Sequence, residues 1–214
     1  MAGVSRVGIL FSGRGSNMGA LLAAAAAPGF PGRVVLALGN VPGAGGFDLA
    51  AAHGAPSICI DHRSFAGDRE AHERAIDAAL QEADVTLVCL AGYMRRLTPY
   101  LVAQWAGRML NIHPSLLPSF PGLHTHRRAL EAGVKLHGCT VHMVTDTVDD
   151  GPILAQAAVP VLPGDDEDRL AARVLAQEHA LYPATLARVL TASPGRFDPA
   201  AALLNPLPIE PAAP

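Results

Sequence analysis

Short apolar runs alternate with segments of helical composition along the first half of the chain, and this alternation constrains the fold more than any other feature. A strand, a helix and a further strand in succession build a parallel sheet with right-handed crossovers. The run at 85–91 is continuously apolar, which predicts a central strand covered on both faces. We predict strands at 7–11, 34–38, 57–60, 85–91 and 109–112, and helices at 18–27, 47–53, 68–83 and 99–106, the last capped by Thr98.

The second half of the chain departs from this alternation. Residues 125–132 have helical composition, whereas 138–144 and 153–160 resemble strands joined by a turn too short to hold a helix. A long helix over 165–190 is expected to be kinked or broken near Pro183. We therefore predict an α/β fold with a Rossmann-like, mostly parallel sheet, mixed toward the C-terminal half, and helices on both faces.

Composition indicates one core and a short appendage. The chain has 214 residues, of which 50% are hydrophobic, and residues 1–192 are expected to form a single domain. The sequence turns rich in proline and alanine after that point, which predicts a surface arm or disordered tail over 193–214.

Charge and cysteine content narrow the class of protein and its compartment. With 16 basic and 19 acidic residues the net charge is −3, which argues against a generally basic nucleic-acid-binding protein. No apolar run approaches the ~18 residues of a membrane span, and the N-terminus lacks the pattern of a signal peptide. Three cysteines without a Cys-x-x-Cys pair predict reduced thiols in a cytoplasm.

A glycine-rich turn links the first predicted strand to the first predicted helix. Gly13 and Gly15 allow a tight turn, and Ser16 and Asn17 stand at a helix N-terminus, where free N–H groups favour an anion such as a phosphate. A dinucleotide fingerprint fits poorly, because Met18 occupies the place of its third glycine and no acidic residue follows the second strand. A Gly-Lys-Ser/Thr sequence is also missing, so this is not a Walker loop. The turn fits either a monophosphate site or a plain βα connection.

Two polar segments carry candidate catalytic chemistry. Asn111 and His113 are two residues apart at the end of a predicted strand, so their side chains point to the same side. An amide donor and an imidazole can together stabilise an oxyanion and move a proton. The turn over 145–152 is dense in carboxylates, and a carboxylate beside an imidazole favours the imidazolium. Spacing alone also fits a hydrogen-bonded histidine at a strand end and a solvated acidic turn.

Histidines at positions 113, 124, 126, 137 and 142 raise the question of a metal site. The sequence contains no His-Glu-x-x-His, no Cys-x-x-Cys and no compact ligand set. We therefore predict that the protein uses no metal.

Three motifs, taken in order, resemble one family. They are Ser-Gly-Arg-Gly-Ser-Asn at 12–17, Leu-Ala-Gly-Tyr-Met-Arg at 90–95, and a long run at 111–126 that begins Asn-Ile-His-Pro-Ser-Leu-Leu-Pro. Together with Asp149 and Glu178, these motifs resemble the phosphoribosylglycinamide formyltransferases of purine biosynthesis. The long run is the most specific part of the resemblance.

The resemblance implies the formyltransferase fold and a one-carbon transfer. In the family, the amine of glycinamide ribonucleotide attacks the formyl carbon of the cosubstrate 10-formyltetrahydrofolate, and tetrahydrofolate leaves. The residues carried over are Asn111, His113 and Asp149 as catalytic groups; Gly15, Ser16, Asn17 and Glu178 for the ribonucleotide and its phosphate; and Arg69, Met94, Arg95, Arg96, Leu97, Asn111, Thr145, Asp146, Thr147, Val148 and Asp149 for the folate. The expected partners are these two small molecules, with no nucleic acid and no membrane, and a homodimer is a candidate assembly.

Three positions depart from the family pattern. Asp150 adds a second carboxylate beside Asp149, so the choice between them depends on the alignment to the following Gly-Pro pair. Arg14 lies inside the phosphate turn, where the family commonly has a small polar residue. Leu175 stands where some relatives have a polar contact to the ribonucleotide.

Other functions share parts of this pattern. A formyltetrahydrofolate hydrolase sends water to the same formyl carbon, but its type usually has an extra N-terminal domain and lacks the Ser-Asn turn. A methionyl-tRNA formyltransferase needs a further basic, RNA-binding C-terminal domain. A non-catalytic nucleotide-binding module is an alternative from a different class. The route that uses formate and ATP depends on an ATP-grasp architecture, which this sequence does not resemble.

Overall fold

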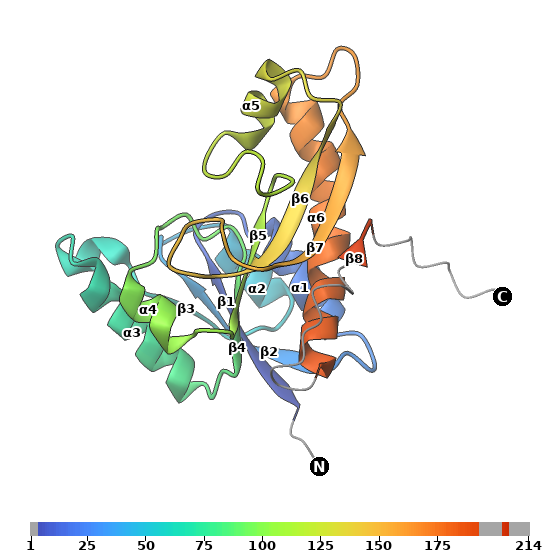
Figure 1. Ribbon diagram of the computed structural model, residues 1–214. Coiled ribbons are helices and arrows are strands. Elements are labelled where there is room, and N and C mark those ends of the chain that lie inside the picture. Colours follow the sequence, from blue (N-terminus) through green and yellow to red (C-terminus); the bar gives the residue numbers. More distant parts are fainter. Residues whose placement is uncertain (1–3, 193–202, 206–214) are drawn as a thin grey trace.

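The computed structural model describes residues 4–192 and 203–205, which are built around one eight-stranded sheet (Figure 1). The strand order is β3-β2-β1-β4-β5-β6-β7-β8. The first five strands are parallel: β1 (Ser5–Phe11), β2 (Gly32–Gly39), β3 (Ser57–Cys59), β4 (Leu87–Leu90) and β5 (Met109–His113). After β1 the chain adds β2 and β3 on one side and then β4 and β5 on the other, so β1 and β4 flank the topological switch point of the sheet. Ligands bind at such switch points in open α/β sheets.

Helices separate the parallel strands as the alternation predicted. They are α1 (Ser16–Ala25), α2 (Gly46–Ala52), α3 (Arg69–Glu82) and α4 (Pro99–Gln104), with a 3-10 turn η1 (His62–Phe65) before α3. The Asp68 side chain caps α3 by accepting a hydrogen bond from the Ala71 backbone N–H. The predicted α/β order of the first half is confirmed.

The second half of the sheet is mixed, which confirms the expectation for this region. Strand β6 (Leu136–Met143) is antiparallel to both β5 and β7 (Ile153–Pro160), and β8 (Leu203–Leu204) is parallel to β7. Helix α5 (Thr125–Glu131) precedes β6 and helix α6 (Glu167–Thr191) follows β7. The β6–β7 hairpin, together with α5, extends away from the parallel half (Figure 1).

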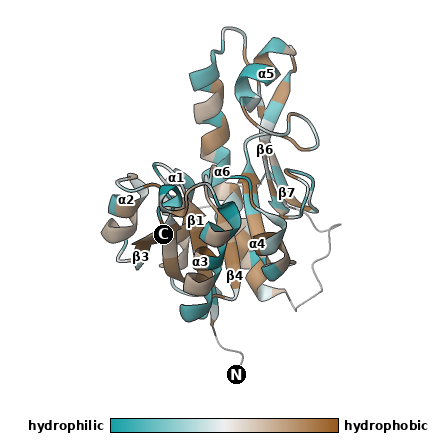
Figure 2. Ribbon diagram, turned by 90° about the vertical axis from the view of Figure 1, so that its left-hand side faces the viewer, coloured by the Kyte–Doolittle hydropathy of each residue, from teal (hydrophilic) through white to brown (hydrophobic). Residues whose placement is uncertain are grey.

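Hydrophobic clusters fill both faces of the sheet. One cluster includes Leu21 of α1 and Leu181 of α6, and the other includes Ile76 and Leu80 of α3 with Leu101 of α4. Figure 2 shows hydrophobic colours along the central strands and mixed colours on the surrounding helices. The predicted helices on both faces are therefore present.

Helix α6 excludes one of the two outcomes expected at Pro183, the break. The helix is not broken there but runs continuously with the proline inside it. Leu181, Tyr182 and Leu186 around the proline are fully buried, and the Tyr182 hydroxyl donates to the carbonyl oxygens of Leu90 at 3.1 Å and Leu110 at 3.2 Å. Tertiary packing therefore outweighs the local cost of an internal proline, about 3 kcal/mol.

None of the helices within the described ranges is long and apolar enough to cross a membrane. The arm or tail expected over 193–214 lies mostly outside the described residues. Within it, Leu203–Leu204 form strand β8 beside β7.

Candidate active site

The carboxyl ends of β1, β4 and β5 bring the three sequence motifs to one edge of the sheet. The register pairs Leu10 with Leu90 and Leu90 with Asn111. Ser12, which begins the glycine turn, accepts a hydrogen bond at Oγ from the Met94 backbone N–H at 2.8 Å, and its own N–H donates to the Gly92 carbonyl at 3.1 Å. The motifs at 12–17, 90–95 and 111–126 therefore meet at the switch point of the sheet.

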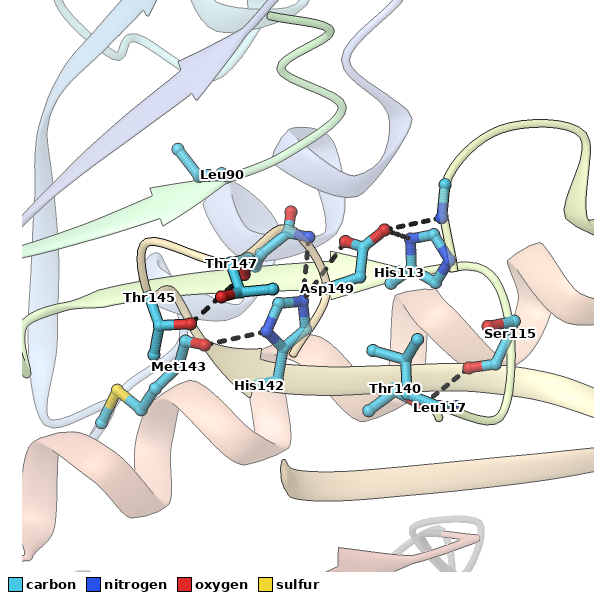
Figure 3. Close-up of polar contacts among 12 residues, drawn as sticks. Leu90, His113, Ser115, Leu117, Thr140, His142, Met143, Thr145, Thr147 and Asp149 are labelled. Atoms are coloured by element: carbon cyan, nitrogen blue, oxygen red, sulfur yellow. Dashed lines mark hydrogen bonds and ion pairs between the residues drawn. The ribbon is translucent and has the colours of Figure 1, made fainter. Parts of the chain in front are cut away.

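His113 lies between two hydrogen-bond acceptors. Its Nδ1 is 3.4 Å from Asp149 Oδ2, and its Nε2 is 3.1 Å from the carbonyl oxygen of Phe120. Figure 3 shows the Asp149 carboxylate directed at the His113 ring. The imidazolium form carries a proton on both ring nitrogens and so satisfies both acceptors. The His113 and Asp149 side chains are only 8% and 9% exposed, so water screens this pair little.

Asp149 is held in place by the loop that follows β5 and by its own tight turn. The Gly122 N–H donates to Asp149 Oδ2 at 2.8 Å. The backbone of Asp149 is left-handed, with φ of 56°, which aspartate tolerates better than most residues. A Cβ at Gly151 would lie 1.8 Å from the Met143 carbonyl oxygen, so only glycine fits there. Of the two neighbouring carboxylates, Asp149 faces His113 and Asp150 is exposed.

Asn111 is oriented by a histidine that the sequence presented only as a metal-ligand candidate. Asn111 Nδ2 donates to His142 Nε2 at 3.1 Å, and His142 Nδ1 donates to the Met143 carbonyl at 2.8 Å. Burial lowers the pKa of His142, which keeps the ring neutral and leaves Nε2 as an acceptor. The amide of Asn111 therefore has a fixed orientation and a second N–H for a ligand.

A pocket opens beside Asn111, His142 and Asp149. Nine of the eleven residues predicted to bind folate line it: Arg95, Arg96, Leu97, Asn111, Thr145, Asp146, Thr147, Val148 and Asp149. Arg69 and Met94 lie outside this lining, and both are exposed.

The same pocket contains lining residues that the sequence did not single out for binding. They are Leu90, Tyr93, Val102, His142 and Val144. Leu90 and Tyr93 belong to the motif at 90–95, so that motif contained a usable signal. Nothing in the sequence distinguishes Val102 and Val144 from other apolar residues, so the sequence contained no signal that they line a pocket.

The glycine turn presents an open helix N-terminus. Gly15 precedes α1 with φ of 75°, and a Cβ there would lie 2.9 Å from Met18 Cε and 3.1 Å from Gly46 Cα. Among the described residues no side chain caps α1, and its first turn contains no acidic residue. The first N–H groups of the helix are thus available to an anion. Arg14 and Ser16 are exposed beside them.

Asn17 and Glu178 form a buried polar pair behind this turn. Asn17 Nδ2 donates to Glu178 Oε2 at 2.7 Å, while Asn17 Oδ1 is buried without a partner among the described residues. Glu178 is 6% exposed, and burial raises the pKa of its carboxyl. Polar groups of this kind are costly in a free fold and typical of ligand sites. Leu175, nearly one turn earlier on α6, is half-buried.

The histidines divide into separate groups. His126 Nδ1 and His137 Nε2 are 3.2 Å apart, and burial lowers the pKa of His137 to about 4, so this pair stays neutral. Within residues 4–192 and 203–205, no three His, Cys, Asp or Glu side chains are grouped to hold a metal ion.

The sheet is mostly parallel with a mixed extension, and an amide, an imidazole and a carboxylate lie at its switch point. Together these features define a class of group-transfer enzyme. The model of the formyl transferase family matches residues 5–186, and the chain belongs to this family.

Its relatives within the family include phosphoribosylglycinamide formyltransferases. The chain is 46% identical to the phosphoribosylglycinamide formyltransferase of Escherichia coli over 175 residues, which is 82% of each chain. The crystal structure of the same enzyme from Brucella melitensis is 54% identical with a TM-score of 0.84, covering 89% of this chain and 98% of that one. The trifunctional purine biosynthetic protein adenosine-3 of Drosophila melanogaster is 49% identical over 187 residues, and the chain spans 14% of its length.

Proposed function

We propose that the protein transfers the formyl group of 10-formyltetrahydrofolate to the amine of glycinamide ribonucleotide in de novo purine synthesis. The amine nitrogen forms a bond to the formyl carbon, and the carbonyl electrons move to oxygen. The bond from that carbon to the folate nitrogen then breaks, the folate nitrogen takes a proton, and formylglycinamide ribonucleotide and tetrahydrofolate leave. The observation that carries this proposal is the 3.4 Å pair of His113 and Asp149 beside Asn111 at the pocket.

Each catalytic group has a role that its contacts support. The second N–H of Asn111 and the imidazolium of His113 stabilise the oxyanion, and one such donor is worth roughly 3–4 kcal/mol. His113 gives a proton to the leaving nitrogen, and at that moment the nitrogen takes the place of one of its two acceptors. Asp149 faces the His113 ring and accepts the proton of the attacking amine, directly or through water.

The two substrates are proposed to bind on either side of these groups. Gly15, Ser16 and Asn17 hold the phosphate at the α1 N-terminus, and Glu178 accepts hydrogen bonds from the ribonucleotide. The folate occupies the pocket lined by 95–97 and 145–149. The exposed Arg69, outside this lining, is proposed to contact a folate carboxylate. The formyl carbon then lies between the two sites, next to Asn111 and His113. No metal takes part in the proposed reaction.

We propose that the reaction takes place in the cytoplasm. The free thiols of Cys59, Cys89 and Cys139 support a reducing compartment. The small-molecule partners follow from the proposed reaction, while a homodimer, and the expectation of no nucleic acid and no membrane, stay predictions from the sequence.

An assay with 10-formyltetrahydrofolate, with and without glycinamide ribonucleotide, tests the proposed function. We expect tetrahydrofolate and formylglycinamide ribonucleotide to appear together, at about 1–10³ per second, only when the ribonucleotide is present. Folate release without the ribonucleotide indicates a hydrolase, and no turnover indicates a binding module. Either of these two results contradicts the proposal.

Removal of the Asn111 amide should lower kcat. We expect Asn111→Ala to lower kcat by about 10²–10³, because an oxyanion donor is used in the transition state and little in the ground state. The KM of each substrate should change far less than kcat. Steady-state kinetics at saturating concentrations of both substrates provides the measurement, and loss of affinity with turnover intact would refute the catalytic role.

Replacement of Glu178 by glutamine should raise stability and weaken ribonucleotide binding. Burial raises the pKa of the Glu178 carboxyl above its ordinary value of 4.5. The ionised carboxylate therefore destabilises the free fold, and this destabilisation grows as the pH rises above 4.5. Glutamine stays neutral and can still accept from Asn17. At pH 7.5 we expect a Tm increase of roughly 2–4 °C, equivalent to about 1 kcal/mol in a chain of this size.

Two comparisons make the Glu178→Gln prediction specific. The Tm difference from wild type should shrink toward zero near pH 4, where both side chains are neutral, and the exposed Glu131→Gln should show no such difference at any pH. The KM for the ribonucleotide should rise in Glu178→Gln alone. A Glu178→Gln protein that is less stable than wild type at pH 7.5 contradicts the destabilising role of the buried carboxylate.

A further inference from the structure

Three side chains form a row across strands β5, β6 and β7. The register pairs His113 directly with Thr140, and Thr140 directly with Gln156. Residues that are directly paired on antiparallel strands have their side chains on the same face of the sheet. His113 therefore has Thr140 as its lateral neighbour, and Gln156 lies one strand further away.

Thr140 and Gln156 together bind the beginning of the loop that follows β5. The Thr140 hydroxyl donates to the Ser115 carbonyl at 2.6 Å and accepts from the Leu117 N–H at 3.0 Å and from Gln156 Nε2 at 3.0 Å. Gln156 Nε2 also donates to the Leu117 carbonyl at 2.8 Å. Both protons of the Gln156 amide nitrogen and the full capacity of the hydroxyl are thus used on this network. Figure 3 shows Thr140, Ser115 and Leu117 grouped beneath His113.

The same loop supplies two backbone groups to the catalytic pair. The Phe120 carbonyl accepts from His113 Nε2, and the Gly122 N–H donates to Asp149 Oδ2. The Ser115 hydroxyl donates to the Ser119 carbonyl at 2.7 Å, which joins the fixed start of the loop to the part that holds His113. The positions of the imidazole and the carboxylate therefore depend on where the loop is held.

We propose that Gln156 is a positioning residue for catalysis, which acts through Thr140 and the 114–122 loop on His113 and Asp149. The inference rests on the proposed formyl transfer, because it assigns a remote side chain to the alignment of that reaction. Gln156 lies outside the lining of the folate pocket, and its side chain hydrogen-bonds to Leu117 and Thr140. Its loss should therefore alter turnover without altering the binding of either substrate.

The expected size of the effect follows from the geometry. Gln156→Met has a similar length but no donor, so the Leu117 carbonyl loses its hydrogen bond and the loop can shift. A displacement of the catalytic groups by about 1 Å can cost 10²-fold in rate. We expect kcat to fall by roughly 10–100-fold, with the KM of each substrate within about threefold of wild type.

Three further variants separate positioning from stability. Thr140→Val removes the hydroxyl at nearly the same volume and should lose turnover as Gln156→Met does, whereas Thr140→Ser keeps the hydroxyl and should retain it. Val7→Ala is the control: Val7 is buried at the start of β1, at the opposite end of the parallel strands, so its variant loses stability without contact to the loop. All kinetics are measured well below the lowest Tm of the set.

The amide resonance of Gly122 provides a readout that does not depend on activity. We expect the Gly122 amide proton in Gln156→Met and Thr140→Val to shift as its hydrogen bond to Asp149 changes, and to stay in place in Thr140→Ser and Val7→Ala. Normal kcat in Gln156→Met, alongside an active wild type, overturns the positioning role. An unshifted Gly122 resonance in Gln156→Met overturns it equally. Absence of ribonucleotide-dependent transfer by the wild type instead contradicts the proposed function, so the two failures are distinguishable.

Discussion

The His113→Ala variant is expected to lose about 10³–10⁴-fold in kcat, which combines the loss of a general acid with the loss of an oxyanion donor. His113 is buried and contacts Asp149, one of the residues that line the pocket, at 3.4 Å. The His113 ring is proposed to stabilise the oxyanion and to protonate the leaving nitrogen. Both interactions arise only during the reaction, so the KM of each substrate should change little. Single-turnover measurements with enzyme in excess follow the chemical step directly.

A matched histidine variant tests whether the effect is specific. His53→Ala replaces an exposed histidine at the end of α2 and should leave kcat within about threefold of wild type. The Tm of His113→Ala must be known, because the loss of its contacts to Phe120 and Asp149 also affects the fold. If His113→Ala keeps its turnover and instead binds a substrate weakly, the imidazole is a binding group and the proposed mechanism is wrong.

Asp149→Asn is expected to lower kcat by about 10³-fold or more, by comparison with a buried Asp–His pair in which the same change costs about 10⁴. The amide retains an oxygen for the Gly122 N–H but has no negative charge opposite the His113 ring and no site for the proton of the attacking amine. The backbone of the turn should stay in place, since asparagine also tolerates the left-handed conformation of this residue.

Asp150→Asn is the control for Asp149→Asn, because it makes the same change one residue further along the chain. Asp150 is exposed, so kcat should stay within about threefold of wild type. Equal losses in the two variants would show that net charge near the pocket, and not the contact to His113, determines the rate. A larger loss in Asp150→Asn would reverse the assignment of the catalytic carboxylate.

The sequence predicted those parts of the fold that are determined by short stretches of neighbouring residues. The alternation of apolar runs and helical segments is visible within windows of 5 to 15 residues, and the strands and helices of the parallel half follow it. The common side of Asn111 and His113 follows from the two-residue period of a strand. Pro183 shows the opposite case, because the packing of α6 against the sheet outweighed a local propensity.

The parts that the sequence could not predict depend on strand register and on loop geometry. Only the pairing of β5 with β6 brings His142 opposite Asn111 and Thr140 opposite His113, and these residues are about 30 positions apart in the chain. A shift of register by one residue would move both side chains to the other face. The choice of Asp149 over Asp150 likewise needs the conformation of the turn, which neighbouring residues in the sequence leave open.

The continuity of the pocket wall with the catalytic carboxylate has a consequence for inhibition. Thr145 to Val148 line the pocket, and the next residue is the one whose carboxylate contacts His113. The Gly122 N–H is the second point at which that carboxylate is held. A small molecule that displaces Thr145 to Val148 outward also moves the Asp149 carboxylate away from the His113 ring. Such a molecule can inhibit the enzyme without occupying the place of the formyl group.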